Sequence, residues 1–116
     1  MYLISGLAHL HTIFLVNSLA HLHGTRPYTP PGREGRDNSH NIWWLAPLTF
    51  GEGWHFNHHS FPSSAKVGLR WYELDLGWLF LRLLAVFGVV WDLKTPAPRE
   101  LSSLRPASPL RELSRP

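Results

Sequence analysis

The chain begins with a long apolar stretch that carries no formal charge: no Asp, Glu, Lys or Arg occurs before Arg26. A helix of about 20 apolar residues crosses the hydrocarbon core of a bilayer. We therefore predict a transmembrane helix over residues 1–23, which Gly24 and Pro27 end. The stretch lacks the basic segment that opens a secretory signal peptide. The alternative is a buried helix of a soluble protein.

Four polar residues interrupt this apolar helix, namely His9, His11, Asn17 and His21. Polar groups inside a membrane are costly, and they usually face a protein interior or a cavity. We therefore expect this helix to pack against other protein rather than against lipid on all sides.

Polar and turn-forming residues then alternate with shorter apolar segments. Residues 26–41 contain three prolines, two glycines and many charges, which predicts an exposed loop. The apolar "IWWLAPLTF" follows, and Trp43 and Trp44 suit either a membrane interface or a protein core. Residues 52–59 read as a helix that ends near Pro62.

The last third of the chain contains one more apolar segment and a polar tail. Residues 75–93 predict a helix, but the segment is short for a crossing and Arg82 lies in its middle. We expect it to lie on the membrane face or to pack into a cap. Residues 95–116 contain five prolines and few apolar residues, so we predict a disordered tail.

Composition makes histidine the unusual residue, because the 116 residues include eight histidines and no cysteine. A metal would have to be held by imidazole, carboxylate, amide or water. Five of the eleven basic residues lie in residues 94–116 rather than in one patch, so the net charge of +3 does not indicate a nucleic-acid partner.

Three histidines lie close together in the sequence "GEGWHFNHHSFPSS". On a helix, His55, His58 and His59 fall within an arc of about 100°. Because His58 and His59 themselves diverge by about 100°, they suit two neighbouring ions better than one. Asn17 and His21 are four residues apart on the first helix, so they share a second face. The pattern indicates a metal site built from two helices.

The residues between the histidines limit the chemistry of this site. The glutamate of the zinc-protease motif H-E-x-x-H is absent, because Phe56 and Asn57 stand between the histidines. Ser60 has no nucleophile-elbow pattern around it. An imidazole-rich set with few carboxylates favours iron or a late first-row metal.

Three segments carry a family resemblance: "NSLAHLHGTRPY", "NSHNIWWLAPLTFGEGWHFNHHSFPSSAKVGLRWYELDLGW" and "WDLKTP". Over residues 16–96 the chain resembles the C-terminal portion of membrane fatty acid desaturases of the acyl-CoA (stearoyl-CoA-like, Δ9) type, particularly bacterial ones. The resemblance implies a di-iron centre that uses O2 and external electrons to introduce a cis double bond into a saturated fatty acyl thioester. It also implies an electron donor similar to ferredoxin or cytochrome b5.

The resemblance assigns roles to individual residues. His55, His58 and His59 match the third histidine box of the family. His21 matches the histidine of the N-S-x-A-H motif, and Asn17 matches its asparagine, which reaches a metal through water. The resemblance therefore implies that all five residues bind the two irons, Asn17 through water.

The resemblance also implies an all-α integral membrane fold with four transmembrane helices under a cytosolic cap. Residues 1–23 would be the last crossing helix, residues 24–94 the cap with the third histidine box, and residues 95–116 a cytosolic tail. Phe14 stands where the family lines its acyl tunnel. The basic loop after residue 25 favours the same orientation.

The chain lacks the family's upstream H-x-x-x-x-H and H-x-x-H-H boxes. We therefore expect a C-terminal fragment, from a truncated gene model, a split gene or a pseudogene, that is inactive without an N-terminal half. Two alternatives stay open. One is a non-catalytic membrane-associated remnant, and the other is a fragment of a related histidine-box hydroxylase.

Overall fold

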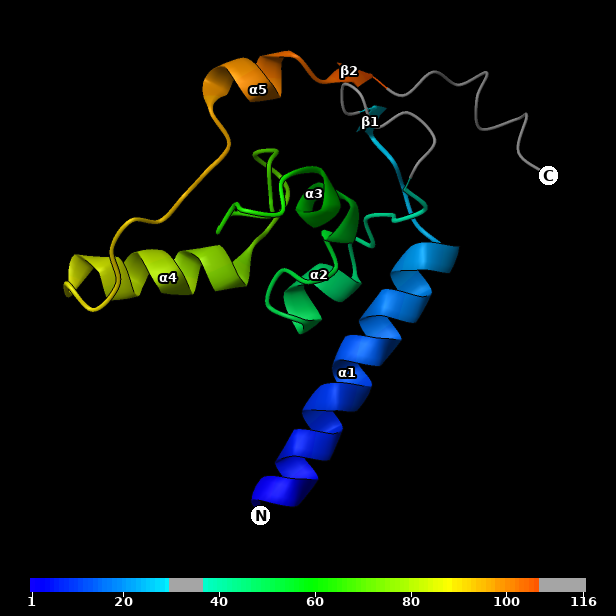
Figure 1. Ribbon diagram of the computed structural model, residues 1–116, viewed down its shortest axis with the longest axis vertical. Helices are drawn as coiled ribbons and strands as arrows, with labels where there is room; N and C mark the ends of the chain where they lie inside the picture. The colour runs from blue at the N-terminus through cyan, green and yellow to red at the C-terminus, as the bar shows by residue number, and fades with distance from the viewer. Residues whose placement is uncertain (30–36, 107–116) are drawn as a thin grey trace.

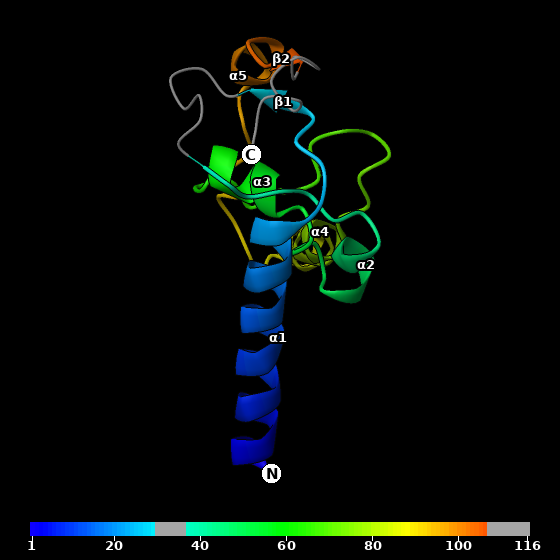
Figure 2. The same cartoon turned by 90° about the vertical axis from the view of Figure 1, so that its right-hand side faces the viewer.

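A long helix and a cap of short elements make up the chain in the computed structural model, which describes residues 1–29 and 37–106. Helix α1 (Tyr2–Leu22) leads away from the cap, and the N-terminus lies at its far end (Figures 1 and 2). The cap (residues 24–94) contains β1 (Tyr28–Thr29), α2 (Leu45–Leu48), α3 (His55–Ser60) and α4 (Leu76–Val86), and the tail contains α5 (Pro98–Ser102) and β2 (Arg105–Pro106). The expectation of a helix-dominated chain is confirmed for the described residues.

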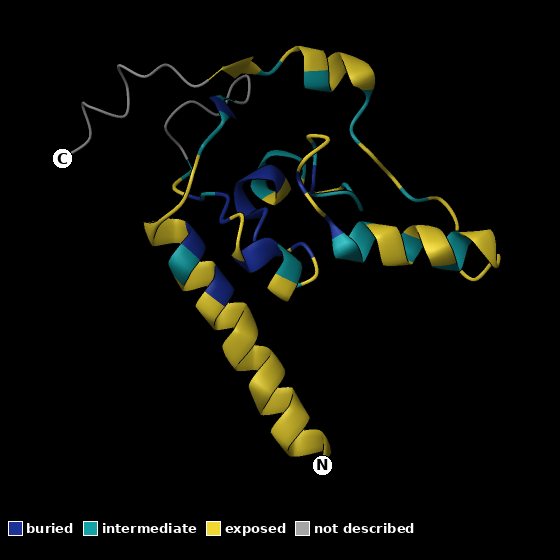
Figure 3. Ribbon diagram, turned by 180° about the vertical axis from the view of Figure 1, so that it is seen from behind, coloured by how far each residue is buried: buried dark blue, intermediate teal, exposed yellow. Residues whose placement is uncertain are grey.

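Helix α1 is the one helix of the described ranges that is long and apolar enough to cross a membrane, by length and composition. Its 21 residues rise about 1.5 Å each, which gives about 30 Å, the thickness of the hydrocarbon core. Only Val16 and Ala20 are buried, so most of α1 is exposed (Figure 3). A helix that is apolar on all sides needs lipid or other protein around it. Residues 1–29 and 37–106 do not supply that cover over most of α1.

The C-terminal end of α1 is fixed to the cap. Val16 and Ala20 pack against two buried cap residues, Ile42 and Leu45. The amide of His40 donates a 2.7 Å hydrogen bond to the carbonyl of Ala20. The last turns of α1 therefore have a defined position relative to the cap.

The turn after α1 requires glycine. Gly24 has a φ of 129°, and a Cβ there would lie 2.5 Å from the carbonyl oxygen of Asn41. This close approach lets Thr25 and Asn41 exchange backbone hydrogen bonds of 2.9 and 2.8 Å. The glycine thus brings the residues before β1 against the segment that leads to α2.

The interior of the cap contains both apolar and polar side chains, and a hydrogen-bond network in it centres on Asn57, which is 1% exposed. Its Oδ1 accepts hydrogen bonds of 2.8 Å from the Tyr28 hydroxyl and from Asn41. Its Nδ2 donates bonds of 2.8 Å to the Val67 carbonyl and to Glu73 Oε2. Because every polar atom of this side chain is satisfied, Asn57 joins α3 to strand β1, to the segment before α2 and to the segment after α3 at low desolvation cost.

Two buried carboxylates hold the chain that follows α3. Glu73 Oε2 also accepts the amides of Leu69 and Arg70, at 2.7 and 3.1 Å. Asp75 Oδ2 accepts the amides of residues 67 and 68. Asp75 Oδ1 caps the N-terminus of α4 through the Trp78 amide at 2.8 Å. Side-chain hydrogen bonds therefore order a segment that has little regular structure.

Helices α3 and α4 are shorter than the sequence pattern predicts. Residues 51–53 form a turn, and α3 begins only at His55 because the backbone of Gly51 (φ 106°) and of Trp54 (ψ 45°) is not helical. Helix α3 ends at Ser60, before Pro62 as expected. Helix α4 ends at Val86, because Gly88, two residues later, has a left-handed backbone with a φ of 68°. Asp92, near the end of the predicted helix, also has a left-handed φ of 55°.

The tail also differs from the sequence prediction of disorder over residues 95–116. Pro98 occupies the first turn of α5, and Glu100 accepts the Ala97 amide at 2.6 Å, an arrangement that favours a helix start. Strand β2 pairs antiparallel with β1, with Tyr28 opposite Pro106. Residues 107–116 of the tail and residues 30–36 of the predicted loop lie outside the described residues.

Candidate metal centre

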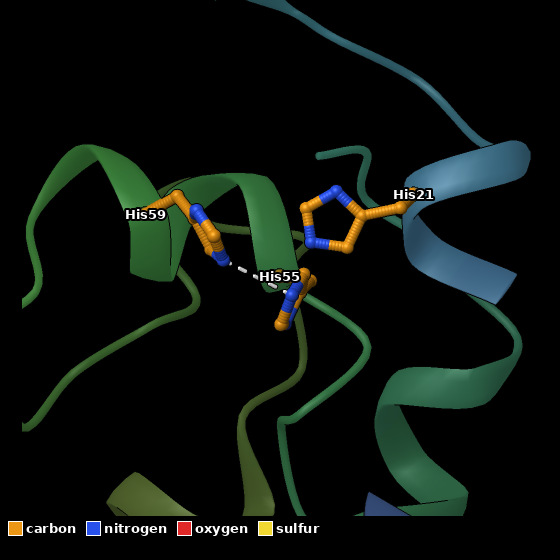
Figure 4. Close-up of side chains that lie close together, drawn as sticks. All are labelled: His21, His55 and His59. Carbon is orange, nitrogen blue, oxygen red and sulfur yellow. Dashed lines mark hydrogen bonds between the residues drawn. The ribbon is translucent and has the colours of Figure 1, made fainter. Parts of the chain in front are cut away.

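Three imidazoles meet where the end of α1 faces α3 (Figure 4). His21 comes from the last turn of α1, and His55 and His59 come from the first and last turns of α3. One ring nitrogen of each lies within 4.8 Å of the others. The ring centroid of His21 lies 5.2 Å from that of His55 and 5.3 Å from that of His59. Helical spacing of four residues places His55 and His59 on one face of α3.

The distance between the ring nitrogens of His55 and His59 fits two ligands of one metal ion. Nε2 of His59 lies 3.1 Å from Nε2 of His55. Two nitrogens bound at right angles to one ion, each about 2.1 Å from it, would be about 3.0 Å apart. A bound ion would therefore replace the hydrogen bond that now joins the two rings. His21 closes the third side of the same space.

Burial sets His55 apart from the other two rings of the cluster. It is 7% exposed, and among the described residues its Nδ1 has no hydrogen-bond partner. A buried, unpaired polar atom is uncommon in folded proteins. Burial, together with the neighbouring imidazoles of His59 and His21, lowers the pKa of His55 to about 4. The ring is therefore neutral at physiological pH, which is the form that binds metal ions. The three residues fit a metal ion of the imidazole-binding class, which includes iron.

The structure does not bring the other predicted metal residues into this group. His58 is exposed, and its ring centroid lies 6.3 Å from that of His55 and 5.9 Å from that of His59. It points elsewhere because successive helix residues differ by about 100°. Asn17, one turn before His21, is also exposed. Phe14, the predicted tunnel residue, is 65% exposed.

The remaining histidines lie outside this group. His9 and His11 are exposed on α1, and Nδ1 of His11 is 2.7 Å from the Leu7 carbonyl. A ring nitrogen of His40 lies 3.1 Å from the Ala20 carbonyl, so His40 helps to hold the end of α1.

Sequence reasoning missed Asp37, whose carboxylate oxygen Oδ2 lies 3.4 Å from Nδ1 of His59. Burial by itself would raise the pKa of Asp37. Hydrogen bonds from the side chain and amide of Ser39, with the nearby charges of His59 and Arg26, outweigh burial and lower this pKa. The spacing Asp-x-Ser predicts a local turn, but no sequence signal indicates that the turn faces His59.

Helix α3 holds His55 and His59 in place through its opposite face. Asn57 lies about 200° from each of them around the helix, and its side chain carries the buried hydrogen-bond network of the cap. Phe56 is 1% exposed, and its ring packs 5.0 Å from that of Tyr28. The six-residue helix is too short to be stable alone, so these tertiary contacts determine its conformation.

The family described as fatty acid desaturase matches residues 1–93. The Delta-9 desaturase-like 5 protein of Arabidopsis thaliana is 42% identical over 94 residues, which are 81% of this chain and 30% of the relative. Delta-9 acyl-lipid desaturase 2 of the same plant is 40% identical over 80% of this chain and 29% of its own length. The sn-1 stearoyl-lipid 9-desaturase of Synechocystis sp. is 44% identical over 74% of this chain and 26% of its own length. The chain therefore spans about a third or less of these relatives.

Proposed function

Because the chain belongs to the fatty acid desaturase family, we propose that it forms part of the iron centre of a membrane fatty acyl desaturase. The proposed reaction is the O2-dependent introduction of a cis double bond into a saturated acyl chain. One observation carries the proposal. His21, His55 and His59, from two separate helices, place their donor nitrogens within 4.8 Å of one another at the end of the apolar helix α1.

We assign the ligands in two groups. His21, His55 and His59 bind one iron ion. His58, and Asn17 through a water molecule, contribute to a second ion that residues outside this chain complete. When bound, the iron pair would supply the oxidation by O2. Two hydrogens from the acyl chain, two electrons from a redox protein similar to ferredoxin or cytochrome b5, and two protons from solvent would together reduce one O2 to two water molecules.

The chain's own contribution is to hold neutral imidazoles in fixed positions. His55 is kept neutral by burial and by the imidazoles beside it. Packing of Val16 and Ala20 against the cap sets the distance between α1 and α3, and therefore between His21 and the other two rings. Preorganisation of this kind lowers the cost of binding the metal.

The proposed fold is all-α, with residues 1–23 as the last of four crossing helices and residues 24–94 as a cytosolic cap. The exposed apolar surface of α1 supports this placement, because other helices or lipid must cover it. Those neighbours would then also cover the exposed polar side chains of His9, His11 and Asn17. Phe14 would line the path of the acyl chain.

The group that carries the acyl chain distinguishes two versions of the proposal. Two of the relatives are named as desaturases of acyl lipids, whereas the resemblance implies an acyl-CoA. Both carriers present the same saturated chain to the iron, so the assay must offer each of them separately.

The first test measures metal in the full chain purified in detergent from iron-supplemented cells. We expect bound iron in the wild type and its loss in His55→Ala. His9→Ala is the matched control, because His9 is an exposed histidine on α1 outside the cluster. Equal iron in all three proteins would show that the cluster is not the site.

The second test co-expresses the chain with a desaturase segment that carries the two upstream histidine boxes. Mass spectrometry of cellular fatty acids, with stearoyl-CoA and stearoyl lipid supplied separately in vitro, identifies product and carrier. A hydroxylated product would assign the chain to a related hydroxylase. The absence of both iron and product in the reconstituted pair would favour a non-catalytic remnant.

A further inference from the structure

We propose that Asp37 is a positioning residue of the metal centre. Its carboxylate accepts the Nδ1 proton of His59 and thereby leaves Nε2 of His59 unprotonated and facing His55. This inference rests on the proposed iron site, but the contact on which it depends exists in the chain without metal.

The two nitrogens of the His59 ring have different neighbours. Nδ1 lies 3.4 Å from Oδ2 of Asp37. Nε2 lies 3.1 Å from Nε2 of His55. A neutral imidazole carries one proton, so a carboxylate at Nδ1 places that proton on Nδ1 and the lone pair on Nε2. The nitrogen that faces the cluster is then the one able to bind a metal ion.

Asp37 is itself held by its surroundings. Ser39, which is fully buried, donates from Oγ to Oδ2 of Asp37 at 2.6 Å and from its amide to Oδ1 at 2.9 Å. Each carboxylate oxygen therefore has a donor besides His59. Because Ser39 already fixes the carboxylate of Asp37, the side chain loses less conformational entropy when it contacts the His59 ring.

A second connection ties the Asp37 loop to α3. The guanidinium of Arg26 donates a hydrogen bond to the backbone carbonyl of Asp37. The same guanidinium lies 5.2 Å from the ring centroid of Phe56, a buried residue of α3. The loop and the helix that carries His59 are thus linked at two points, which favours a fixed distance between the carboxylate and the imidazole.

The expected consequence is a change in metal affinity. A carboxylate hydrogen-bonded to a metal-binding histidine orients the ring, selects its tautomer and makes the bound nitrogen more basic. Loss of such a partner lowers metal affinity about 10–100-fold. Without Asp37, part of the His59 population would carry its proton on Nε2 and could not bind.

The simpler alternative is that Asp37 only closes the turn with Ser39. Asp37→Asn separates the two roles, because the amide oxygen still accepts the Ser39 amide while the negative charge is lost. Asp37→Ala removes both. Asp92→Asn is the matched control, since Asp92 is an exposed aspartate outside the cap core.

The first experiment uses the metal-free full chain in detergent with 15N-labelled histidine. Nitrogen-detected imidazole spectra report which nitrogen of His59 carries the proton. We expect Nδ1–H in the wild type and in Asp92→Asn, and a mixture of the two tautomers in Asp37→Ala. A His59 tautomer that is the same in the wild type and in Asp37→Ala would overturn the proposal.

The second experiment titrates the same proteins with Co2+, a spectroscopic substitute for iron, and follows its visible absorption. We expect an affinity loss of about 10–100-fold in Asp37→Ala. The loss in Asp37→Asn should be at least as large, because an amide whose oxygen accepts the Ser39 amide turns its NH2 group, a donor, toward Nδ1 of His59. Equal affinities in Asp37→Ala and the wild type would also overturn the proposal. Far-ultraviolet circular dichroism confirms that each variant is folded.

The two experiments separate this inference from the proposed function. A wild-type chain that binds no Co2+ and no iron would contradict the metal centre. The tautomer of His59 would still decide whether Asp37 orients that ring.

Discussion

Replacement of Asn57 tests the cap's buried polar network, the largest single group of interactions that holds α3. Asn57→Ala removes a side chain that makes four hydrogen bonds of 2.8 Å. Glu73 keeps its bonds to the amides of Leu69 and Arg70, and the Tyr28 hydroxyl also has Ser60 beside it. The side-chain amide of Asn41 and the carbonyl of Val67 lose these bonds without such a replacement.

The expected loss follows from these two groups. Each buried polar group left without a partner costs about 1–3 kcal/mol. Some of this cost is recovered if water enters the space, so we expect a loss of about 2–4 kcal/mol in the free energy of unfolding. For a domain of this size that corresponds to a fall of about 10–20 °C in the melting temperature.

Asn57→Asp gives a sharper test, because it changes one atom and introduces a charge. The new carboxylate oxygen would stand where Nδ2 now lies, 2.8 Å from Oε2 of Glu73. Two carboxylates at this distance cannot both ionise, so the pKa of the pair rises in the folded state. A raised folded pKa gives a stability that is complete at acid pH and is lost as pH rises through it. The variant should therefore be weakest relative to the wild type near pH 7 and should recover toward pH 4.

Tryptophan fluorescence of the cap during thermal unfolding in detergent measures both effects, and Co2+ binding reports the position of the histidines. Asn38→Ala and Asn38→Asp are the controls, since Asn38 is exposed. We expect both Asn57 variants to weaken Co2+ binding. A melting temperature of Asn57→Ala within a few degrees of its control, with Co2+ affinity unchanged, would refute the idea that this network positions α3.

Two further substitutions test other parts of the cap by the same thermal assay, and an NMR titration tests His55. Gly53→Ala should lower the free energy of unfolding by about 1–3 kcal/mol, because the new Cβ would lie 2.3 Å from the Ala46 nitrogen. Gly6→Ala is the control and should be neutral or stabilising, because its Cβ meets no atom within 4 Å. Equal effects of the two substitutions would contradict the close packing at position 53. Asp75→Ala should lower the free energy of unfolding by about 2–4 kcal/mol, because it removes the N-terminal capping side chain of α4 and the acceptor of two backbone amides. A loss below 1 kcal/mol would contradict this role. Burial and the neighbouring imidazoles lower the pKa of His55 to about 4 in the metal-free chain, so its NMR titration should have a midpoint near pH 4. The free energy of unfolding should fall as the pH drops from about 6.5 to 4, because in this range only the unfolded chain takes up the proton. A midpoint near 6.5 would contradict the burial of this ring.

The local features of the chain could be predicted from the sequence. An uncharged apolar run predicts α1, and glycine at position 24 predicts its end, because both signals act over a few residues. Spacing of four residues predicts that His55 and His59 share one face of a helix, and the chain also supplies His21 from a second helix. The family could also be predicted from the sequence, because its motifs are short and continuous.

The tertiary structure decided which of these residues meet. It places His59 rather than His58 beside His55 and His21, and it brings Asp37 to the other side of the His59 ring. It also gives Asn57, a residue with no special signal in the sequence, the central position in the cap. These contacts join residues far apart in the chain.

The C-terminal segment shows the same limit. Its proline content predicted disorder, yet α5 forms and β2 pairs with β1, more than seventy residues earlier. Composition reports how much apolar surface a segment can bury by itself. It does not report the hydrogen bonds and packing that a distant strand offers, and the free energy from those contacts decides whether such a segment is ordered.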